Sequence, residues 1–405
     1  MNTEKSVFPR ELLQQPKEER FTYFRNKVIG HDRLLEVDDQ ILQAIHYPSG
    51  KSLILVYGPT GVGKSTLRMR LVQKLLAVER DAMVEDPGYL PVAWMDALAA
   101  SRSYDWREHF AGALSAAKEP LVDYKSDYSS QMAHKQERTS HADRSELALR
   151  RSFVSCAHHR RMKVFIIDEA QHLNRIGSGK RLTDQMNTIK SVAEETGAIH
   201  VLIGTYDLLD LTGLSAQLCR RSAQVHFSRY SNFDDDDRDA FASALETFQR
   251  HLPLAQTPDL LRFEDYLYEK TLGCVGVLKT LLNDALSKAL RLEAETITEE
   301  ILKECAPPLR DLIEMSSEIG EGERALAETD EQVAKLKAFV NTPPSSIKKK
   351  SATKGKEKVE TQATSPAVKE QNESGETAAP KPKYRLKPGE RNPKRDRIGR
   401  RKNAS

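Results

Sequence analysis

One eight-residue segment restricts what this chain can fold into more than any other. Residues 58–65 read GPTGVGKS and match the pattern GxxxxGK[ST] at each defined position. The apolar run Leu53–Tyr57 before the segment predicts a buried strand, and a helix is expected from Lys64 to about Ala77. A strand, a glycine-rich turn and a helix in this order predict a phosphate-binding loop. The alternative, a glycine-rich turn that happens to precede a helix, explains the lysine and the serine less well.

The chemistry of such a loop assigns a task to its residues. Glycines let the backbone turn tightly, so that successive N–H groups point at the phosphates, and the helix adds its positive N-terminal end. We expect Lys64 to reach the β and γ phosphates of a nucleotide and Ser65 to coordinate Mg²⁺. The candidate nucleotide-binding residues of the loop are Gly58, Pro59, Thr60, Gly61, Val62, Gly63, Lys64, Ser65 and Thr66.

Two carboxylates follow a second apolar run. Val164–Ile167 predicts a buried strand, and Asp168 and Glu169 come directly after it. In enzymes with a phosphate loop, the first acid at such a strand end holds Mg²⁺. The second acid suits a general base that polarises the attacking water. The alternative is an aspartate that caps the next helix. The adjacent glutamate favours hydrolysis, at a slow rate, over simple retention of the nucleotide.

Three more apolar runs predict strands, at Val92–Met95, Ile199–Ile203 and Gln224–Phe227. Helical patterns separate them, so we expect an α/β fold with a parallel sheet between layers of helices. After Asn232 the apolar spacing is helical only, and a last amphipathic piece runs from Glu323 to Val340. The predicted organisation is an N-terminal arm (1–27), an αβα nucleotide-binding core (28–232), a small all-helical lid (233–306), a C-terminal helical extension (307–340) and a disordered basic tail (341–405).

The charge of the chain is unevenly distributed. Residues 341–405 hold 18 Lys or Arg and 7 Asp or Glu, a net charge of +11. Because the whole chain carries +3, residues 1–340 carry −8. The tail also has few bulky apolar residues, and it therefore cannot bury enough surface to offset the entropy lost on folding. We expect a disordered tail and a polyanionic partner.

Other features exclude several classes of protein. No apolar run approaches the roughly 18 residues needed to span a bilayer, and the polar segment Met1–Glu18 has no hydrophobic signal core. We therefore expect a cytoplasmic protein without a membrane partner. The cysteines lie far apart and form no CxxC pair, which argues against a disulfide framework or an ordinary zinc ribbon. These cysteines are Cys156, Cys219, Cys274 and Cys305.

Further polar residues follow predicted strands and helices. Thr205 ends the strand that begins at Ile199, and ligands gather at the carboxyl ends of parallel strands. Its hydroxyl is a candidate to orient the attacking water, and the alternative is a turn cap. Arg220 and Arg221 suit an arginine that acts across a subunit interface, although the residues alone favour two solvated arginines at a helix end. Lys279 is either a nucleotide contact or an ordinary exposed lysine.

Together these motifs resemble those of an AAA+ ATPase with a helical lid. Within that superfamily, the chain resembles the regulators of DNA transposition known as TnsC and TniB over about residues 28–300. Three strings carry this narrower resemblance. They are IIDEAQHL at 166–173, LIGT at 202–205 and QLCRR at 217–221. The DEAQH string and the arginine pair also occur in bacterial secretion-linked ATPases.

The resemblance implies a function. Such proteins bind ATP and Mg²⁺, assemble into rings or helical filaments around duplex DNA, and disassemble on hydrolysis. They connect a target selector, either a protein or an RNA-guided complex, to the transposase. By the same resemblance Arg220 or Arg221 is the arginine finger, and Val28 and Ile29, with His31, lie near the adenine. The long basic tail departs from the compact members of the family.

DNA contacts are the least constrained part of this interpretation. A filament on DNA needs cations that neutralise phosphates, with little reading of the bases. For any single candidate, a solvated charged face is the better explanation. The candidates are Arg102, Ser103, Arg107, Lys118, Arg150 and Arg151. The basic tail is expected either to bind DNA weakly or to dock on the transposase.

Two other functions remain open. A replication-initiator or helicase-loader ATPase would share the core, but it would usually add a winged-helix domain after the lid. About 35 residues separate the predicted lid from the tail, which is too few for such a domain. A signalling switch would hold nucleotide and bind protein partners without DNA. Neither the hydrolysis rate nor the identity of the partners follows from the sequence.

Overall fold

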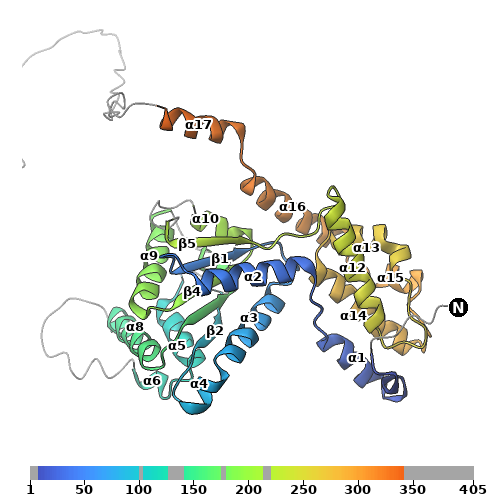
Figure 1. The fold of residues 1–405 in the computed structure, drawn as a ribbon, viewed down its shortest axis with the longest axis horizontal. Helices are drawn as coiled ribbons and strands as arrows, with labels where there is room; N and C mark the ends of the chain where they lie inside the picture. The colour runs from blue at the N-terminus through green and yellow to red at the C-terminus, as the bar shows by residue number, and fades with distance from the viewer. Residues whose placement is uncertain (1–7, 100–103, 126–140, 175–178, 213–219, 342–405) are drawn as a thin grey trace, which may run out of the picture. The chain divides into compact units, whose positions relative to one another are not determined.

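Five strands form one parallel sheet in the computed structural model (Figure 1). The structure describes residues 8–99, 104–125, 141–174, 179–212 and 220–341. The strand order is β2-β3-β4-β1-β5. The strands are β1 (Leu53–Tyr57), β2 (Val92–Asp96), β3 (Val164–Asp168), β4 (Ile199–Gly204) and β5 (Ser222–His226). Each lies within two residues of a strand expected from the sequence, and the expected α/β fold is confirmed.

The alternation of side chains along the strands explains the two helical layers. In β1, Leu53 and Leu55 pack on one face of the sheet, while Ile54 and Val56 pack on the other. All five residues of β1 are buried, as expected for a central parallel strand that is covered on both sides. The edge strand β2 instead exposes Trp94.

Each face of the sheet has its own helices (Figure 1). Helices α2 (Asp32–His46) and α3 (Lys64–Val78) cover the face that contains Ile54. Helices α5 (Trp106–Ala116), α8 (His141–His159) and α9 (Gly179–Thr196) cover the face that contains Leu55. The short elements around the sheet are α4 (Arg80–Glu85), α6 (Val122–Lys125), α10 (Leu209–Thr212), and the 3₁₀ turns η2 (Ala170–Asn174) and η3 (Tyr206–Leu208).

A separate apolar core holds the helical lid together. The lid comprises α12 (Asp235–His251), η4 (Leu261–Phe263), α13 (Glu264–Thr271), α14 (Val275–Arg291) and α15 (Glu299–Cys305). The chain begins with η1 (Arg10–Gln14) and α1 (Lys17–Asn26). Helix α1 packs on α14 and buries Phe24 in the core of the lid. The expected N-terminal arm is therefore part of the packing of the lid.

The region after the lid differs from the expectation. A single amphipathic piece was expected over Glu323–Val340, but the chain forms α16 (Leu309–Leu326) and α17 (Asp330–Val340). Pro308 precedes α16, and Ala327 ends it in an extended conformation. The earlier part of α16 is hard to find in the sequence because its buried apolar residues, Leu312 and Ile319, are few and widely spaced.

The chain contacts divide the molecule into two units, 1–334 and 335–405, and the site lies in the first. The tail from residue 342 onwards is outside the described residues, so its expected disorder stays a prediction.

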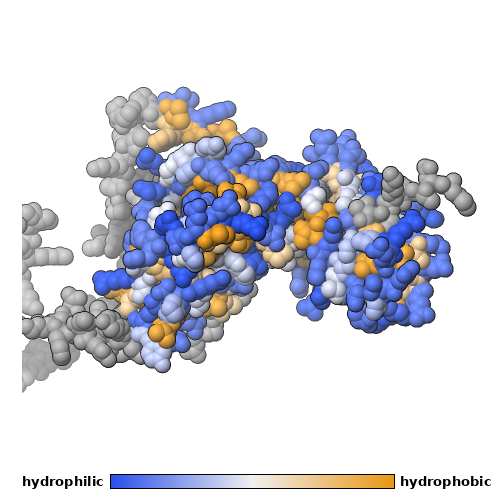
Figure 2. All heavy atoms as spheres, turned by 60° about the horizontal axis from the view of Figure 1, so that its bottom comes forward, coloured by the Kyte–Doolittle hydropathy of each residue, from blue (hydrophilic) through white to orange (hydrophobic). Residues whose placement is uncertain are grey.

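Figure 2 shows a face that is mainly hydrophilic, with apolar residues in small patches. No helix in the described part of the chain combines the length and apolar character needed to cross a bilayer.

The burial of His200 on β4 predicts acid sensitivity. Its Nδ1 lies 3.1 Å from Ala198 O, its ring meets Phe165 edge-on, and burial lowers its pKa from 6.5 to about 4. The unfolded chain therefore binds a proton in this window that the folded chain does not. Stability is complete above pH 6.5 and is lost as the pH falls towards 4. We expect the melting temperature to fall by several degrees between pH 7 and 4.5.

The dependence on His200 is checked by repeating the pH series with His200→Phe. This variant should lose less stability on acidification, whatever its stability at pH 7. His46→Gln is the matched control, because His46 is exposed and should leave the slope unchanged. Equal slopes for wild type and His200→Phe would contradict the assignment.

Candidate functional site

The predicted phosphate loop joins β1 to α3 and is closed by tight backbone contacts. A Cβ at Gly58 would overlap Phe227 O, so a side chain at this position is excluded. Gly61 and Gly63 have φ values of +79° and +119°, which L-residues with a side chain rarely adopt. The glycines expected from the motif are therefore required by the backbone itself.

Lys64 lies inside this loop. Its Nζ donates hydrogen bonds to Gly58 O and Pro59 O, both at 2.9 Å. Only 9% of the residue is exposed, and burial lowers its pKa. The ammonium group is thus held by carbonyl dipoles and partly desolvated, an arrangement that strengthens its attraction for an incoming anion.

The second predicted strand end presents Asp168 next to a cation. Arg68 Nε lies 2.8 Å from Asp168 Oδ2, and the backbone N–H of Glu169 donates to Oδ1 at 2.9 Å. Asp168 is 2% exposed, and burial raises its pKa. The guanidinium of Arg68 also lies over the Trp94 ring, 3.7 Å from its centroid. The sequence analysis did not identify Arg68, which follows the motif by one helical turn.

A glutamine links Glu169 to Thr205. Gln171 Nε2 donates to Glu169 Oε2 at 2.5 Å, and the backbone N–H of Thr205 donates to Gln171 Oε1 at 3.2 Å. Glu169 itself has a positive φ of +52°. The two polar strand ends are therefore connected through one side chain. Gln171 was present in the DEAQH string, but no role had been assigned to it.

A cavity of about 480 Å³ lies beside the loop. Val28 and Ile29, which were expected near an adenine, line it together with His31. Gly63 and Thr66 line it on the loop side, and residues of α14 line it on the lid side. The cavity therefore lies between the first residues of the core, the phosphate loop and the lid.

The lid is joined directly to the phosphate loop. The backbone N–H of Val277 donates to Gly61 O at 3.1 Å. Gly276 lies so close to Gly61 O that an added Cβ would overlap it. This contact explains why residue 276 is a glycine, and it places the start of α14 against the loop.

Lys279 lines the cavity, but its ammonium group contacts Phe24 of α1. Its Nζ donates to Phe24 O at 2.5 Å and lies 3.5 Å from the centre of the Phe24 ring. Burial lowers its pKa to about 7. The expected contact with a nucleotide stays a prediction, since in the structure this lysine ties α14 to α1.

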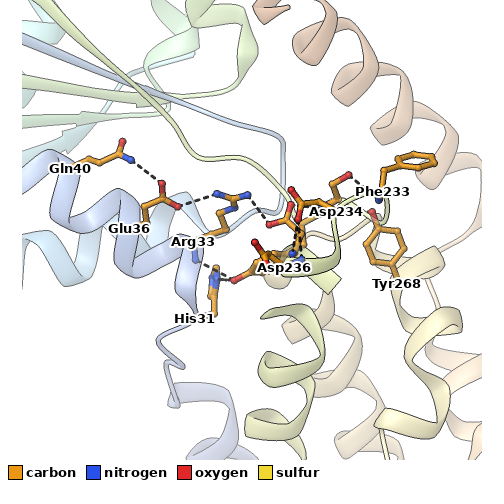
Figure 3. Close-up of polar contacts among 11 residues, drawn as sticks. His31, Arg33, Glu36, Gln40, Phe233, Asp234, Asp236 and Tyr268 are labelled. Atoms are coloured by element: carbon orange, nitrogen blue, oxygen red, sulfur yellow. Dashed lines mark hydrogen bonds and ion pairs between the residues drawn. The ribbon is translucent and has the colours of Figure 1, made fainter. Parts of the chain in front are cut away.

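Polar contacts connect the start of α2 to the lid (Figure 3). Arg33 Nη2 lies 2.7 Å from Asp237 Oδ1, and the backbone N–H of Ser231 donates to Asp237 Oδ2. His31 Nδ1 lies 3.0 Å from Tyr230 Oη, and burial lowers the pKa of His31 to about 4. Asp234 caps α12. Asp237 is therefore a buried ion-pair partner.

Arg220 and Arg221 lie far from the phosphate loop of their own chain. They precede β5, and Ser222 of β5 is paired with Leu53 at the start of β1, whereas the loop follows the end of β1. Both side chains are exposed, and Arg221 Nη1 lies 2.5 Å from Glu194 Oε1. These arginines cannot reach their own loop, so a catalytic role requires a neighbouring subunit.

The predicted DNA contacts differ in exposure and in their partners. Arg102 and Ser103 lie outside the described residues. Arg107, Lys118 and Arg151 are exposed, and Arg151 lines a shallow basic cleft. Arg150 is engaged within the chain, because its Nη2 donates to Ser191 Oγ and pairs with Glu195 at 2.6 Å. The DNA role of these residues stays a prediction.

The predicted Mg²⁺ ligands fit the chemistry of this ion. Ser65 is exposed on the first turn of α3, and Asp168 supplies a carboxylate at the end of β3, which β4 separates from β1. Mg²⁺ prefers oxygen ligands and retains several waters alongside substrate phosphates. Among the described residues, no group of three or more His, Cys, Asp or Glu side chains forms a metal site. Phosphate oxygens and water would therefore complete the coordination.

Comparison with known proteins agrees with this geometry. Residues 45–212 match the family model of the AAA domain. The fold is that of an AAA+ domain. No curated protein matches this sequence.

Solved structures resemble this chain at low identity. Aeropyrum pernix ORC2 in its ADPNP–ADP complexes is 15% identical, with 69% of each chain covered and a TM-score of 0.44. The Walker-type ATPase of Pyrococcus abyssi is 17% identical, with 76% of each chain covered and a TM-score of 0.41. Drosophila ORC bound to DNA is 14% identical, with 85% of this chain and 73% of that chain covered and a TM-score of 0.44. None of these is named as a regulator of transposition, so that resemblance stays a prediction.

Because Gly276 touches Gly61 O, we expect that adding one methyl group at position 276 pushes the lid away from the loop. Gly276→Ala should force the two backbones apart at a cost of about 1–3 kcal/mol and weaken nucleotide binding by about 5–150-fold. Isothermal titration calorimetry with ADP measures the affinity. Gly320→Ala is the control, because a Cβ at Gly320 meets open space. Equal affinities for the two variants would contradict the proposed dependence on this contact.

Proposed function

We propose that this AAA+ protein binds ATP between its phosphate loop and its lid and converts ATP and water to ADP and phosphate. One observation carries the proposal. Lys64 lies within a closed phosphate loop, and Gln171 links the carboxylate of Glu169 to the backbone N–H of Thr205 at the ends of two strands of the same parallel sheet. The cavity beside the loop accommodates the rest of the nucleotide.

The residues divide the work of hydrolysis. The N–H groups of the loop and Lys64 bind the phosphates, and Mg²⁺ at Ser65 and Asp168 would neutralise charge on their oxygens. Glu169 polarises the attacking water as general base. Gln171 fixes the carboxylate of Glu169 through its Nε2, and its Oε1 accepts from the backbone N–H of Thr205. Val28 and Ile29 provide apolar contacts for the base.

The arginines before β5 support self-association. They lie at the opposite end of the sheet from their own loop, so either one would act on the nucleotide of a neighbour in a ring or filament. Arg220 is the better candidate for the finger, because Arg221 is paired with Glu194. A site completed by a second copy explains a slow, regulated ATPase that becomes active only in an assembly.

We propose further that the protein regulates DNA transposition. It would assemble on duplex DNA in the ATP state, connect a target selector to the transposase, and disassemble on hydrolysis. The three strings that resemble those of TnsC and TniB and the +11 charge of the tail support this proposal. A loader-type or signalling ATPase that acts on protein partners is the alternative, because it would share the same AAA domain.

Glu169→Gln should separate binding from hydrolysis. Loss of the base should slow ATP turnover by about 10²–10⁴-fold while ATP still binds, and assemblies on duplex DNA should persist. Phosphate release measures the turnover, and electron microscopy with and without DNA and ATP reports the assemblies. Lys64→Ala is the paired control that should bind no nucleotide and form no ATP-dependent assembly. Particles that stay monomeric under all conditions would favour the signalling alternative.

Mixing two inactive variants tests whether an arginine acts between subunits. Glu169→Gln binds nucleotide and keeps the arginine but lacks the base, whereas Arg220→Ala keeps the base but lacks the arginine. Mixed assemblies contain interfaces at which an intact arginine faces an occupied site with an intact base, so part of the ATPase activity should return. Arg221→Ala mixed in the same way identifies the finger. No recovery with either arginine variant would exclude action across the interface.

A further inference from the structure

Helix α16 lies against the phosphate loop. Glu318 Oε1 accepts hydrogen bonds from the backbone N–H of Thr60 at 3.3 Å and from Thr60 Oγ1 at 3.0 Å. Thr60 is the third residue of the loop, and 258 positions separate the two partners in sequence. The carboxylate of Glu318, which belongs to the C-terminal extension, therefore accepts from a backbone N–H of the loop, and such N–H groups bind anionic phosphates.

The position of α16 is fixed by contacts close to the site. Arg229 Nε and Nη2 pair with the two oxygens of Glu323, at 2.8 and 3.2 Å. Gly322 packs directly on the ring of Tyr206, where an added Cβ would overlap the ring. Because Tyr206 follows Thr205, α16 lies beside the strand end that carries the polar link to Glu169.

These contacts place Glu318 on the side of the terminal phosphate. The loop cradles the inner phosphates of a nucleotide, and its lysine reaches the outer two. The γ phosphate therefore points towards Lys64 and the strand ends that carry Glu169 and Thr205. Helix α16 contacts both borders of that space, Thr60 on one side and Tyr206 on the other.

The negative charge of Glu318 favours the protonated form of Lys64. Among the groups whose charge favours the protonated form of Lys64, Glu318 has the largest effect, ahead of Glu169 and Asp168. A γ phosphate would bring further negative charge next to this carboxylate, and like charges at a few ångströms in a partly desolvated site repel strongly. A diphosphate lacks the group that would meet Glu318.

We propose that Glu318 makes this site discriminate between nucleoside diphosphates and triphosphates, and that a triphosphate displaces α16 from the loop. The inference rests on the proposed nucleotide binding. Binding of the triphosphate and docking of α16 oppose each other, so each weakens the other by the same factor.

Helix α16 is suited to such a release. Its buried apolar residues are Leu312 and Ile319, whereas Leu309 and Ile313 are exposed. Its other contacts are the packing of Gly322 on Tyr206, the partly buried Leu326 against the core, the pair between Arg229 and Glu323, and the bond between Glu318 and Thr60. An element with few buried apolar contacts opens at low cost compared with the core of the domain.

The test uses the full chain and measures the affinities for ADP and for a non-hydrolysable ATP analogue by calorimetry. Glu318→Gln keeps the size of the side chain but removes its charge. It should strengthen binding of the analogue about tenfold more than binding of ADP. Glu314→Gln is the matched control, because this glutamate is one turn away on the same helix, is 71% exposed, and pairs only loosely with Arg310. Its ratio of affinities should equal that of wild type.

Hydrogen exchange provides a second measurement on the unaltered protein. The amides of residues 309–326 should exchange faster with the ATP analogue bound than with ADP bound. A ratio of affinities that Glu318→Gln leaves unchanged, or exchange in α16 that is equal in the two nucleotide states, would overturn the inference alone. Failure of wild type to bind either nucleotide would overturn the proposed function and this inference with it.

Discussion

The site depends on backbone segments that approach each other too closely for side chains. The loop after β1 meets Phe227 O at Gly58, and the lid meets Gly61 O at Gly276. Both contacts involve peptide groups, so they fix the loop between the end of β5 and the start of α14 whatever side chains surround it. The hydrogen bond from Val277 N–H to Gly61 O then makes the lid an extension of the loop. A ligand that reshapes the loop must therefore also move the lid.

Buried charges around this framework are paired with charges from neighbouring elements. Asp38 on α2 is fully buried and lies 2.6 Å from Lys74 of α3. Asp168 at the end of β3 lies against Arg68 of the same α3. A buried carboxylate without a partner would be costly, so these pairs also fix α3 relative to the sheet. At Asp168 the same kind of pair holds the carboxylate to which the proposed function assigns Mg²⁺.

Much of the core could be read from the sequence because local patterns and the fold agree there. The apolar runs at Leu53–Tyr57 and Val164–Ile167 are buried parallel strands, and the glycine motif allows one backbone path between strand and helix. The parts that were missed depend on contacts between distant segments. Nothing in the residues around Gln171 or Glu318 indicates their partners, Thr205 and Thr60, which lie 34 and 258 positions away. The packing of Phe24 in the core of the lid could not be predicted for the same reason, because its partners there are distant in the sequence.

Three segments from different parts of the chain therefore meet at one loop: the lid at Gly61, α16 at Thr60, and the start of the core along the cavity. The lid and the core bind through backbone and apolar groups, which respond little to the charge of a ligand. Helix α16 contributes the carboxylate that faces the loop, so it is the element whose docking depends on how many phosphates are bound. Because α16 leads along the chain towards the basic tail, a change in its docking would connect the nucleotide state to the segment with the greatest positive charge.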